Sequence, residues 1–166
     1  MTIINISGYS VMLDDEDVER IARLKWHVGK TKAEKYGLCY FRHTVHYHKC
    51  DKKQGCYAIL LHRYIMGCAP EAIETVDHID GNTLNCQKSN LRICSGLENS
   101  RNRKRNKNNL SGYKGVSRRK ASKKWVAQIQ VEGRNFYLGS FTDPKVAHEA
   151  YKEAAIKYHG EFARFE

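Results

Sequence analysis

Residues 99–109 constrain the fold of this chain more than any other segment, because every side chain in them is polar or basic. Such a segment cannot contribute to a hydrophobic core and is typical of a linker or of a helix extension. The chain has 166 residues, which is enough for one ordinary domain or for two small ones. We therefore expect two small modules, each with a thin core, on either side of this segment.

The charge balance favours a polyanionic partner. Lys and Arg number 29 against 18 Asp and Glu, which gives a formal net charge of +11. Nucleic acid fits best, because neutralising phosphates releases counterions and drives binding. A basic protein at a membrane surface is the alternative, but it needs an amphipathic helix with a broad cationic face, and we find none in the sequence. Double-stranded DNA is the expected partner, with no membrane and no small-molecule substrate.

The sequence predicts an intracellular protein with reduced thiols. No run of about 18 apolar residues is present, and the first residues lack the pattern of a secretory signal. All six cysteines lie in the first 94 residues, without a C-x-x-C pair, so zinc is not an expected cofactor. Solvated histidines and buried thiols on a hairpin account for these residues. The alternative is a zinc site, with ligands drawn from His43, His46, His48, Cys50 and Cys56.

Apolar spacing predicts one helix and two strands in the first region. A helical period follows two aspartates and is shared by Val18, Ile21, Ala22 and Leu24. Strands are expected at residues 37–42 and 56–61, with a hairpin turn at residues 51–55.

The most informative stretch is residues 76–85, Val-Asp-His-Ile-Asp-Gly-Asn-Thr-Leu-Asn. A short strand is expected to end near Asp77 and His78. The Asp-Gly pair and the nearby asparagines favour a turn before a second strand at residues 89–93.

A helix is expected after these strands. Ser95 and Glu98 fit the two ends of a capping box, which places Asn99 in the first helical turn. A carboxylate, an imidazole and an amide oxygen could then converge on one point. These groups suit phosphodiester hydrolysis, because imidazole can take a proton from water and oxygen atoms suit a hard divalent cation. Taken alone, an Asp-His pair is more often a structural hydrogen bond.

The spaced motif resembles the ββα-metal motif of phage HNH homing endonucleases over residues 56–103. The resemblance implies that His78 activates the attacking water, while Asp77 and Asn99 hold one Mg²⁺ or Mn²⁺ ion. It also implies that Asn90 supports the loop rather than taking part in the chemistry. The last of the three residues that give the HNH motif its name is Asn99 in this chain, where the family name has His.

The resemblance extends to further residues and to the source of the chain. Cys86 stands where such sequences often have another Asn. His62 and Arg63 are given a structural role, with DNA contact as the alternative. A phage-encoded protein in the cytoplasm of a bacterial host cell is implied.

The C-terminal region has its own pattern of three strands and one helix. Strands are expected at residues 113–120, 124–131 and 135–141, with turns near residues 121–123 and 132–133. In the middle strand, alternation puts Gln128 and Gln130 on the face opposite the apolar side chains. The helix begins at Asp143-Pro144 and ends at Gly160. Its apolar stripe is predicted to contain Val146, Ala147, Ala150, Tyr151, Ala154, Ala155 and Tyr158.

This region resembles the AP2 DNA-binding domain over residues 112–165, through Tyr-Lys-Gly-Val, Lys-Trp-Val-Ala, Tyr-Leu-Gly-Ser-Phe and Ala-His-Glu-Ala-Tyr. The resemblance implies that the sheet enters the major groove, where side chains distinguish base pairs. Residues on the exposed face that match are Lys114, Arg119, Gln128, Gln130, Asn135 and Tyr137. Phosphate contacts are expected from Arg118, Lys120, Lys123 and Lys124, and a backbone-tracking arm would include Arg101 and Arg103.

The target sequence and the role of this half of the chain are left open. Several plant members carry Arg where this chain has Ser117, Gln130 or Asn135, which leaves the target sequence undetermined. An ordinary α+β domain with a charged face is the alternative for this half.

The sequence thus predicts an α+β protein with four parts: an N-terminal part of the nuclease domain (1–55), the HNH motif (56–103), a basic linker (104–111) and an AP2-like domain (112–166). We expect a monomeric or homodimeric, metal-dependent endonuclease that nicks DNA at a site chosen by its C-terminal sheet. The alternative from another class is a non-catalytic DNA-binding regulator that keeps the HNH fold as a scaffold.

Overall fold

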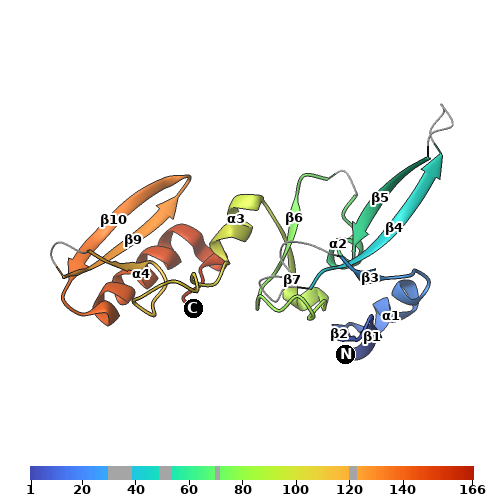
Figure 1. Cartoon of the computed structure of the whole chain (residues 1–166), viewed down its shortest axis with the longest axis horizontal. Coiled ribbons are helices and arrows are strands. Elements are labelled where there is room, and N and C mark those ends of the chain that lie inside the picture. The colour runs from blue at the N-terminus through green and yellow to red at the C-terminus, as the bar shows by residue number, and fades with distance from the viewer. Residues whose placement is uncertain (30–38, 49–53, 70–71, 120–122) are drawn as a thin grey trace. The chain divides into compact units, whose positions relative to one another are not determined.

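The computed structural model describes residues 1–29, 39–48, 54–69, 72–119 and 123–166. Packing divides the chain into two compact units, Met1–Ser95 and Gly96–Glu166 (Figure 1). Each unit combines helices with small antiparallel sheets, so the predicted α+β class is confirmed.

The first unit begins with a hairpin and a short helix. Strands β1 (Thr2–Ile6) and β2 (Tyr9–Leu13) pair in antiparallel register, and α1 (Asp15–Ala22) follows them. Three acidic side chains in the first turn of α1 favour its N-terminal dipole. The helix appears where the spacing predicts it, and its Ile21 is buried in the core of this unit.

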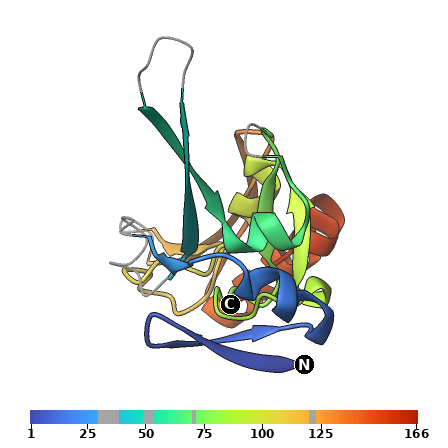
Figure 2. The ribbon, with the colours of Figure 1, turned by 90° about the vertical axis from the view of Figure 1, so that its right-hand side faces the viewer.

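A three-stranded sheet forms the middle of the first unit. It has the order β3 (His27–Val28), β4 (Phe41–His48) and β5 (Gln54–Leu60). The β4–β5 ribbon extends well beyond the other elements of this unit (Figure 2). Phe41 at the start of β4 and Leu61 at the start of α2 (Leu61–Ile65) are both buried, and they join the hairpin core.

The last part of the first unit is the hairpin of β6 (Thr75–His78) and β7 (Leu91–Cys94). A long loop and a short 3-10 helix, η2 (Lys88–Asn90), connect the two strands. Helix α3 (Gly96–Arg101) follows β7, so the predicted order of strand, loop, strand and helix is observed. By its packing, α3 belongs to the second unit.

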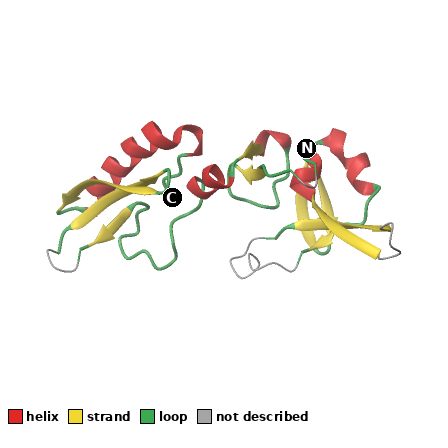
Figure 3. Cartoon of the chain, turned by 90° about the horizontal axis from the view of Figure 1, so that it is seen from above, coloured by secondary structure: helices red, strands yellow, loops and turns green. Residues whose placement is uncertain are grey.

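The second unit is a three-stranded sheet covered on one face by a helix. Strands β8 (Val116–Arg118), β9 (Trp125–Val131) and β10 (Arg134–Phe141) pair with β9 in the centre. Helix α4 (Pro144–His159) packs on the face that carries Ala127 and Ile129, and η3 (Gly160–Phe162) follows it (Figure 3). Asp143 caps α4, since its carboxylate accepts a hydrogen bond from the backbone N–H of Lys145 at 2.8 Å.

The predicted apolar stripe of α4 is partly wrong. Val146 and Tyr158 remain 50% and 41% exposed, whereas His148 and His159 are buried. The two imidazoles can be buried because each has a carbonyl partner. Nδ1 of His148 lies 3.0 Å from the carbonyl oxygen of Lys114, and Nε2 of His159 lies 3.0 Å from that of Gln130.

One predicted strand is shorter than expected, and another begins later than expected. β8 begins only at Val116, because the backbone turns at Gly115 with φ of +76°. A Cβ atom at Gly115 would lie 1.9 Å from the ring of Tyr151, so only glycine fits this position. The strand expected at residues 37–42 begins at Phe41, and residues 37–38 lie outside the described ranges, as do residues 51–53 of the expected hairpin turn and residues 121–122 of the expected turn before β9.

Candidate functional site

The β6–β7 hairpin positions the two central residues of the motif. Asp77 and His78 are the last two residues of β6, and both are buried. The antiparallel register places Asp77 opposite Arg92 and His78 opposite Leu91. Adjacent residues of a strand point to opposite faces, so the carboxylate and the imidazole occupy different sides of this small sheet.

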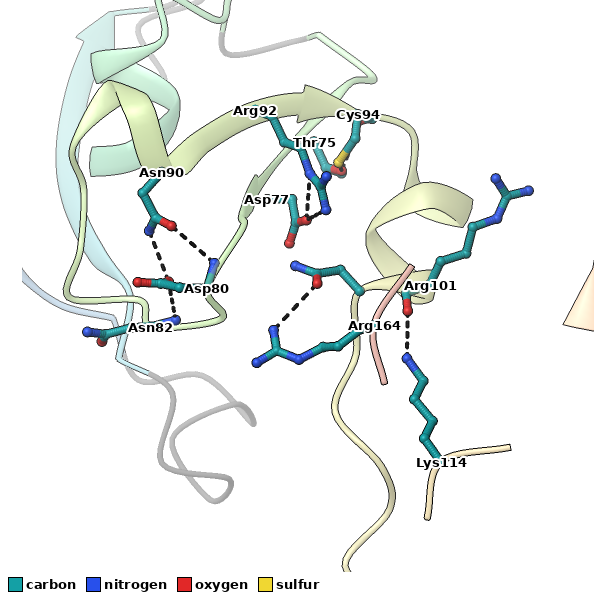
Figure 4. Close-up of polar contacts among 11 residues, drawn as sticks. Thr75, Asp77, Asp80, Asn82, Asn90, Arg92, Cys94, Arg101, Lys114 and Arg164 are labelled. Atoms are coloured by element: carbon teal, nitrogen blue, oxygen red, sulfur yellow. Dashed lines mark hydrogen bonds and ion pairs between the residues drawn. The ribbon is translucent and has the colours of Figure 1, made fainter. Parts of the chain in front are cut away.

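Arg92 forms an ion pair with Asp77 across the two strands (Figure 4). Its Nε and Nη2 atoms donate to the same carboxylate oxygen, at 3.1 and 2.9 Å. The side chains of Arg92 and Asp77 are only 12% and 7% exposed. The arginine therefore neutralises and orients a buried carboxylate, a contact that the motif alone did not predict.

His78 lies within a cluster of aromatic and sulfur-containing side chains. Its ring centroid is 5.1 Å from that of His62 and 6.4 Å from that of Tyr40. The thiol of Cys86 is 3.9 Å from Nε2 of His78. Burial lowers the pKa of His78 from its ordinary 6.5, and the negative charges of Asp80 and Asp77 offset only part of this effect. Burial therefore favours the neutral imidazole, which is the form that can accept a proton.

The loop that follows His78 is organised by amide side chains. The carboxylate of Asp80 accepts hydrogen bonds from the backbone N–H of Asn82 and the side chains of Asn85 and Asn90, at 2.7, 3.0 and 3.0 Å. Burial opposes its charge, but these bonds outweigh that effect and lower the pKa of Asp80.

Asn90 closes this loop from its other end. Its Oδ1 accepts from the backbone N–H of Asp80 at 3.0 Å (Figure 4). Its Nδ2 also donates to the carbonyl of Asn85 at 2.8 Å. Its own carbonyl accepts from the N–H of Ile79 at 2.9 Å. Asn90 thus makes contacts within the loop and holds the residues next to His78 in place.

The N-terminal hairpin fixes the far side of the same loop. The N–H of Met12 donates to the carbonyl of Leu84, and the N–H of Cys86 donates to the carbonyl of Met12, both at 2.9 Å. Asp14 accepts from the backbone N–H of Lys88 at 2.8 Å and from the side chain of Gln87 at 3.2 Å. The first residues of the chain therefore complete the unit that holds Asp77 and His78, a contact that sequence reasoning missed.

The neighbouring residues His62 and Arg63 of helix α2 have different contacts. His62 is buried beside His78, and burial, followed by the charges of His78 and Arg63, lowers its pKa to about 3. The guanidinium of Arg63 donates to the carbonyls of Ala69, Ala72 and Glu74. Arg63 therefore fixes the segment that leads into β6.

Asn99, the third residue of the motif, is the fourth residue of α3 and is half-buried. Because α3 packs with the second unit, its approach to Asp77 stays a prediction. The oxygens of a carboxylate and an amide suit Mg²⁺ or Mn²⁺, which typically take one or two carboxylates, waters and substrate oxygens. The Asp77 carboxylate therefore offers the kind of oxygen ligand that suits such an ion, and Asn99 stays a predicted second ligand.

The alternative zinc site involves residues that the structure describes only in part, since the side chain of His48 is not described. Among the described residues, we find no cluster of three or more His, Cys, Asp or Glu side chains that could hold a metal ion. Cys50 of the alternative zinc hairpin lies outside those residues.

The open face of the second sheet carries the predicted base-contacting residues. Gln128 pairs with Tyr137 and Gln130 with Asn135 across β9 and β10, and all four side chains are exposed. They lie on the face opposite α4, where no described element covers them (Figure 3). The strand alternation expected for β9 is therefore observed.

The basic residues of this unit differ in their surroundings. Arg119, Lys123, Lys124 and Arg103 are exposed, and Lys120 lies outside the described ranges. Arg118 is exposed, with its guanidinium carbon 5.5 Å from the centre of the Trp125 ring, a cation–π contact.

Lys114 and Arg101 are less exposed than the other described residues that were predicted to bind DNA, and a hydrogen bond joins them. The ammonium group of Lys114 is half-buried and donates to the carbonyl of Arg101 at 2.7 Å (Figure 4). Burial, together with the nearby charge of Arg164, lowers the pKa of Lys114 to about 8. This geometry favours a structural role, in which Lys114 ties the end of α3 to the sheet.

Comparisons with known proteins match both halves of the chain. The HNH endonuclease family model matches residues 62–101, and the AP2 domain model matches residues 111–161. The chain therefore belongs to the HNH endonuclease family, in a form that carries a C-terminal AP2 domain. The β8–β10 sheet with α4 is the AP2 domain, which follows the HNH domain in the predicted order.

A phage protein is similar to more than half of the chain. Protein 3.8 of Escherichia phage T7 is 40% identical over 90 residues, which make up 54% of this chain and 74% of that protein. No solved structure matches the chain. The two domains together support a role in DNA binding and nuclease activity. No helix within the described ranges is long and apolar enough to cross a membrane.

Proposed function

We propose that this protein is a site-specific DNA endonuclease that hydrolyses phosphodiester bonds at its HNH centre. The observation that carries the proposal is the buried pair Asp77 and His78 at the end of β6, in which Arg92 orients the Asp77 carboxylate. A relative encoded by a bacteriophage supports action on DNA in the cytoplasm of an infected bacterial cell, and homing behaviour belongs to this proposal.

In the proposed reaction, His78 takes a proton from the attacking water through a ring nitrogen. The resulting hydroxide forms a bond to phosphorus while the bond to the leaving sugar oxygen breaks. Arg92 keeps the Asp77 carboxylate in position, and the hydrogen bonds of Asn90 hold the loop beside His78.

One divalent ion, Mg²⁺ or Mn²⁺, would be held by Asp77 and Asn99. When bound, such an ion neutralises negative charge on the phosphate and on the leaving oxygen. Oxygen ligands suit these hard ions better than they suit zinc.

Target choice is assigned to the open face of the AP2 sheet. Its exposed amides can form paired hydrogen bonds with base edges in the major groove, as Gln128, Gln130 and Asn135 would, with Tyr137 beside them. Arg101, Arg103, Arg118 and Arg119 would contact phosphates or bases next to this face, and the DNA contact expected of Lys114 gives way to its structural role.

A monomer with one active site is expected to nick DNA, whereas a homodimer could cut both strands. The test is incubation of supercoiled plasmid, host DNA and phage DNA with the protein, in Mg²⁺ or Mn²⁺ and in EDTA. Conversion of closed circles to nicked circles in the divalent ion alone supports the proposal.

The second candidate is a DNA-binding regulator that uses the HNH fold as a scaffold. It is favoured by the exposed polar face of the second sheet, and it predicts sequence-specific binding of phage or host DNA without any cleavage. Neither strand would be cut in any of the divalent ions tested.

A further inference from the structure

The positive charge of this chain is concentrated in one continuous segment. Residues 99–131 contain 11 Lys and Arg and no Asp or Glu, against 29 and 18 in the whole chain. The remaining residues therefore contain 18 basic and 18 acidic side chains, so the whole formal excess of +11 lies in residues 99–131. This segment includes the last three residues of α3, the expected linker and the first two strands of the AP2 sheet.

The part of this segment expected to be a linker is folded against the AP2 sheet. The side chain of Asn109 makes five hydrogen bonds, with Ser111 (two), Gly112, Tyr113 and Val116, at 2.6 to 3.4 Å. The backbone N–H of Arg105 donates to the carbonyl of Glu166 at 2.9 Å. Residues 103–111 therefore form a strap of defined shape within the second unit.

The strap and the sheet enclose an open groove of about 580 Å³. Every residue that lines it belongs to the acid-free segment. Its cations and amides include Arg103, Lys104, Arg105, Asn106, Arg118 and Gln128, and all six side chains are exposed. Gln128 also belongs to the open face of the sheet, so the groove adjoins the proposed base-reading surface.

We propose that this groove extends the DNA-contacting surface onto the strap, where Lys104 and Arg105 bind the sugar-phosphate backbone of the duplex whose bases the sheet reads. Guanidinium and ammonium groups bind phosphates without reading sequence, and side-chain amides can donate hydrogen bonds to phosphate oxygens. The hydrogen bonds of Arg105 N–H and of the Asn109 side chain hold the backbone of the strap in place before DNA arrives, which lowers the entropy cost of binding. The inference rests on the proposed function only in taking double-stranded DNA as the ligand.

The test compares two double variants with the same change of charge. Lys104→Gln/Arg105→Gln removes two cations from the groove, while Lys145→Gln/Lys157→Gln removes two exposed cations from α4, which covers the other face of the sheet. Affinity for a non-specific duplex is measured at several salt concentrations by fluorescence anisotropy.

The groove pair is expected to reduce the slope of log affinity against log salt by about two units, since each phosphate contact contributes about 0.9. Its deficit relative to wild type should then shrink roughly tenfold between about 50 and 200 mM salt. The helix pair should leave the slope within about half a unit of wild type. Equal slope changes in the two pairs, or no change in the groove pair, overturns the proposal.

This outcome is separable from the fate of the proposed function. If the protein cuts no DNA but only the groove pair changes the salt slope, the groove proposal stands and the proposed nuclease function is wrong. If the protein cuts DNA but the two pairs change the salt slope equally, the proposed nuclease function stands and the groove proposal is wrong.

Discussion

Replacing Arg92 by leucine is expected to destabilise the first unit, because it removes the cation that neutralises the Asp77 carboxylate. The two hydrogen bonds of this pair are 3.1 and 2.9 Å long, and the side chains are only 12% and 7% exposed. Removing one partner of a buried ion pair typically costs about 3 to 5 kcal/mol. We expect a value near the lower end, about 3 kcal/mol, since the guanidinium keeps some contact with solvent.

The matched control is Arg23→Leu, which breaks an ion pair of similar length at the surface. Arg23, the C-cap residue of α1, lies 2.6 Å from Glu19 one turn earlier, and their side chains are 73% and 83% exposed. Such pairs contribute at most about 0.5 kcal/mol, because water and salt screen them. The contrast between the two variants therefore isolates the effect of burial.

The assay is urea denaturation followed by the fluorescence of Trp26. The chain has two tryptophans, one in each unit, so a Trp125→Phe background leaves Trp26 as the reporter of the first unit. Trp26 is half-buried and donates a hydrogen bond to the carbonyl of Ile21 at 3.0 Å, so unfolding changes its environment. A loss below about 1 kcal/mol for Arg92→Leu, comparable to that of the surface variant, would refute the assignment of a buried, neutralising pair.

Three further predictions concern the packing and the charge of single residues. Gly115→Ala should cost about 3 kcal/mol or more, because the new Cβ would lie 1.9 Å from Tyr151 at a φ of +76°; a thermal melt of the second unit with less than half that loss contradicts the prediction. Asn109→Ala should cost a similar amount, since five hydrogen bonds of about 1 kcal/mol each are partly replaced by water; an unchanged melt would argue against a folded strap. Because folding lowers the pKa of His62 from 6.5 to about 3, the unfolded chain binds that proton first, and stability falls as the pH drops below 6.5. His62→Phe should therefore flatten this fall by up to about 1.4 kcal/mol per pH unit, and an unchanged slope in acid denaturation would contradict the lowered pKa.

The sequence predicted the elements that depend on local pattern. Alternation placed Gln128 and Gln130 on the open face of β9, and the aspartate, proline and glycine around residues 143–160 marked both ends of α4. The strand, loop, strand and helix of the HNH motif also followed from spacing and turn residues, because these signals act over a few residues.

Contacts between segments distant in the sequence could not be predicted from local pattern. The bonds of Met12 with Leu84 and Cys86 join segments more than 70 residues apart, and no local signal announces them. The burial of His148 and His159 depends on carbonyl groups of the turn before β8 and of β9, which the sequence of the helix does not reveal. The apolar spacing therefore predicted that Val146 and Tyr158 are buried, whereas both are exposed.

The Arg92 pair was within reach of sequence reasoning. Once the β6–β7 register is known, Arg92 is the residue opposite Asp77, and opposite charges in that position attract each other. The register itself depends on the length of the loop from residue 79 to residue 90, which its turn residues do not fix.

The most direct test of the central claim compares wild type with His78→Ala on a DNA that the wild type cuts. Losing a general base typically lowers the rate by about 100-fold to 10,000-fold. We predict a loss in that range for single-turnover cleavage in Mg²⁺, with the dissociation constant for the same DNA unchanged within about twofold, because the AP2 sheet binds through other residues. Cleavage by His78→Ala at the wild-type rate would contradict the account.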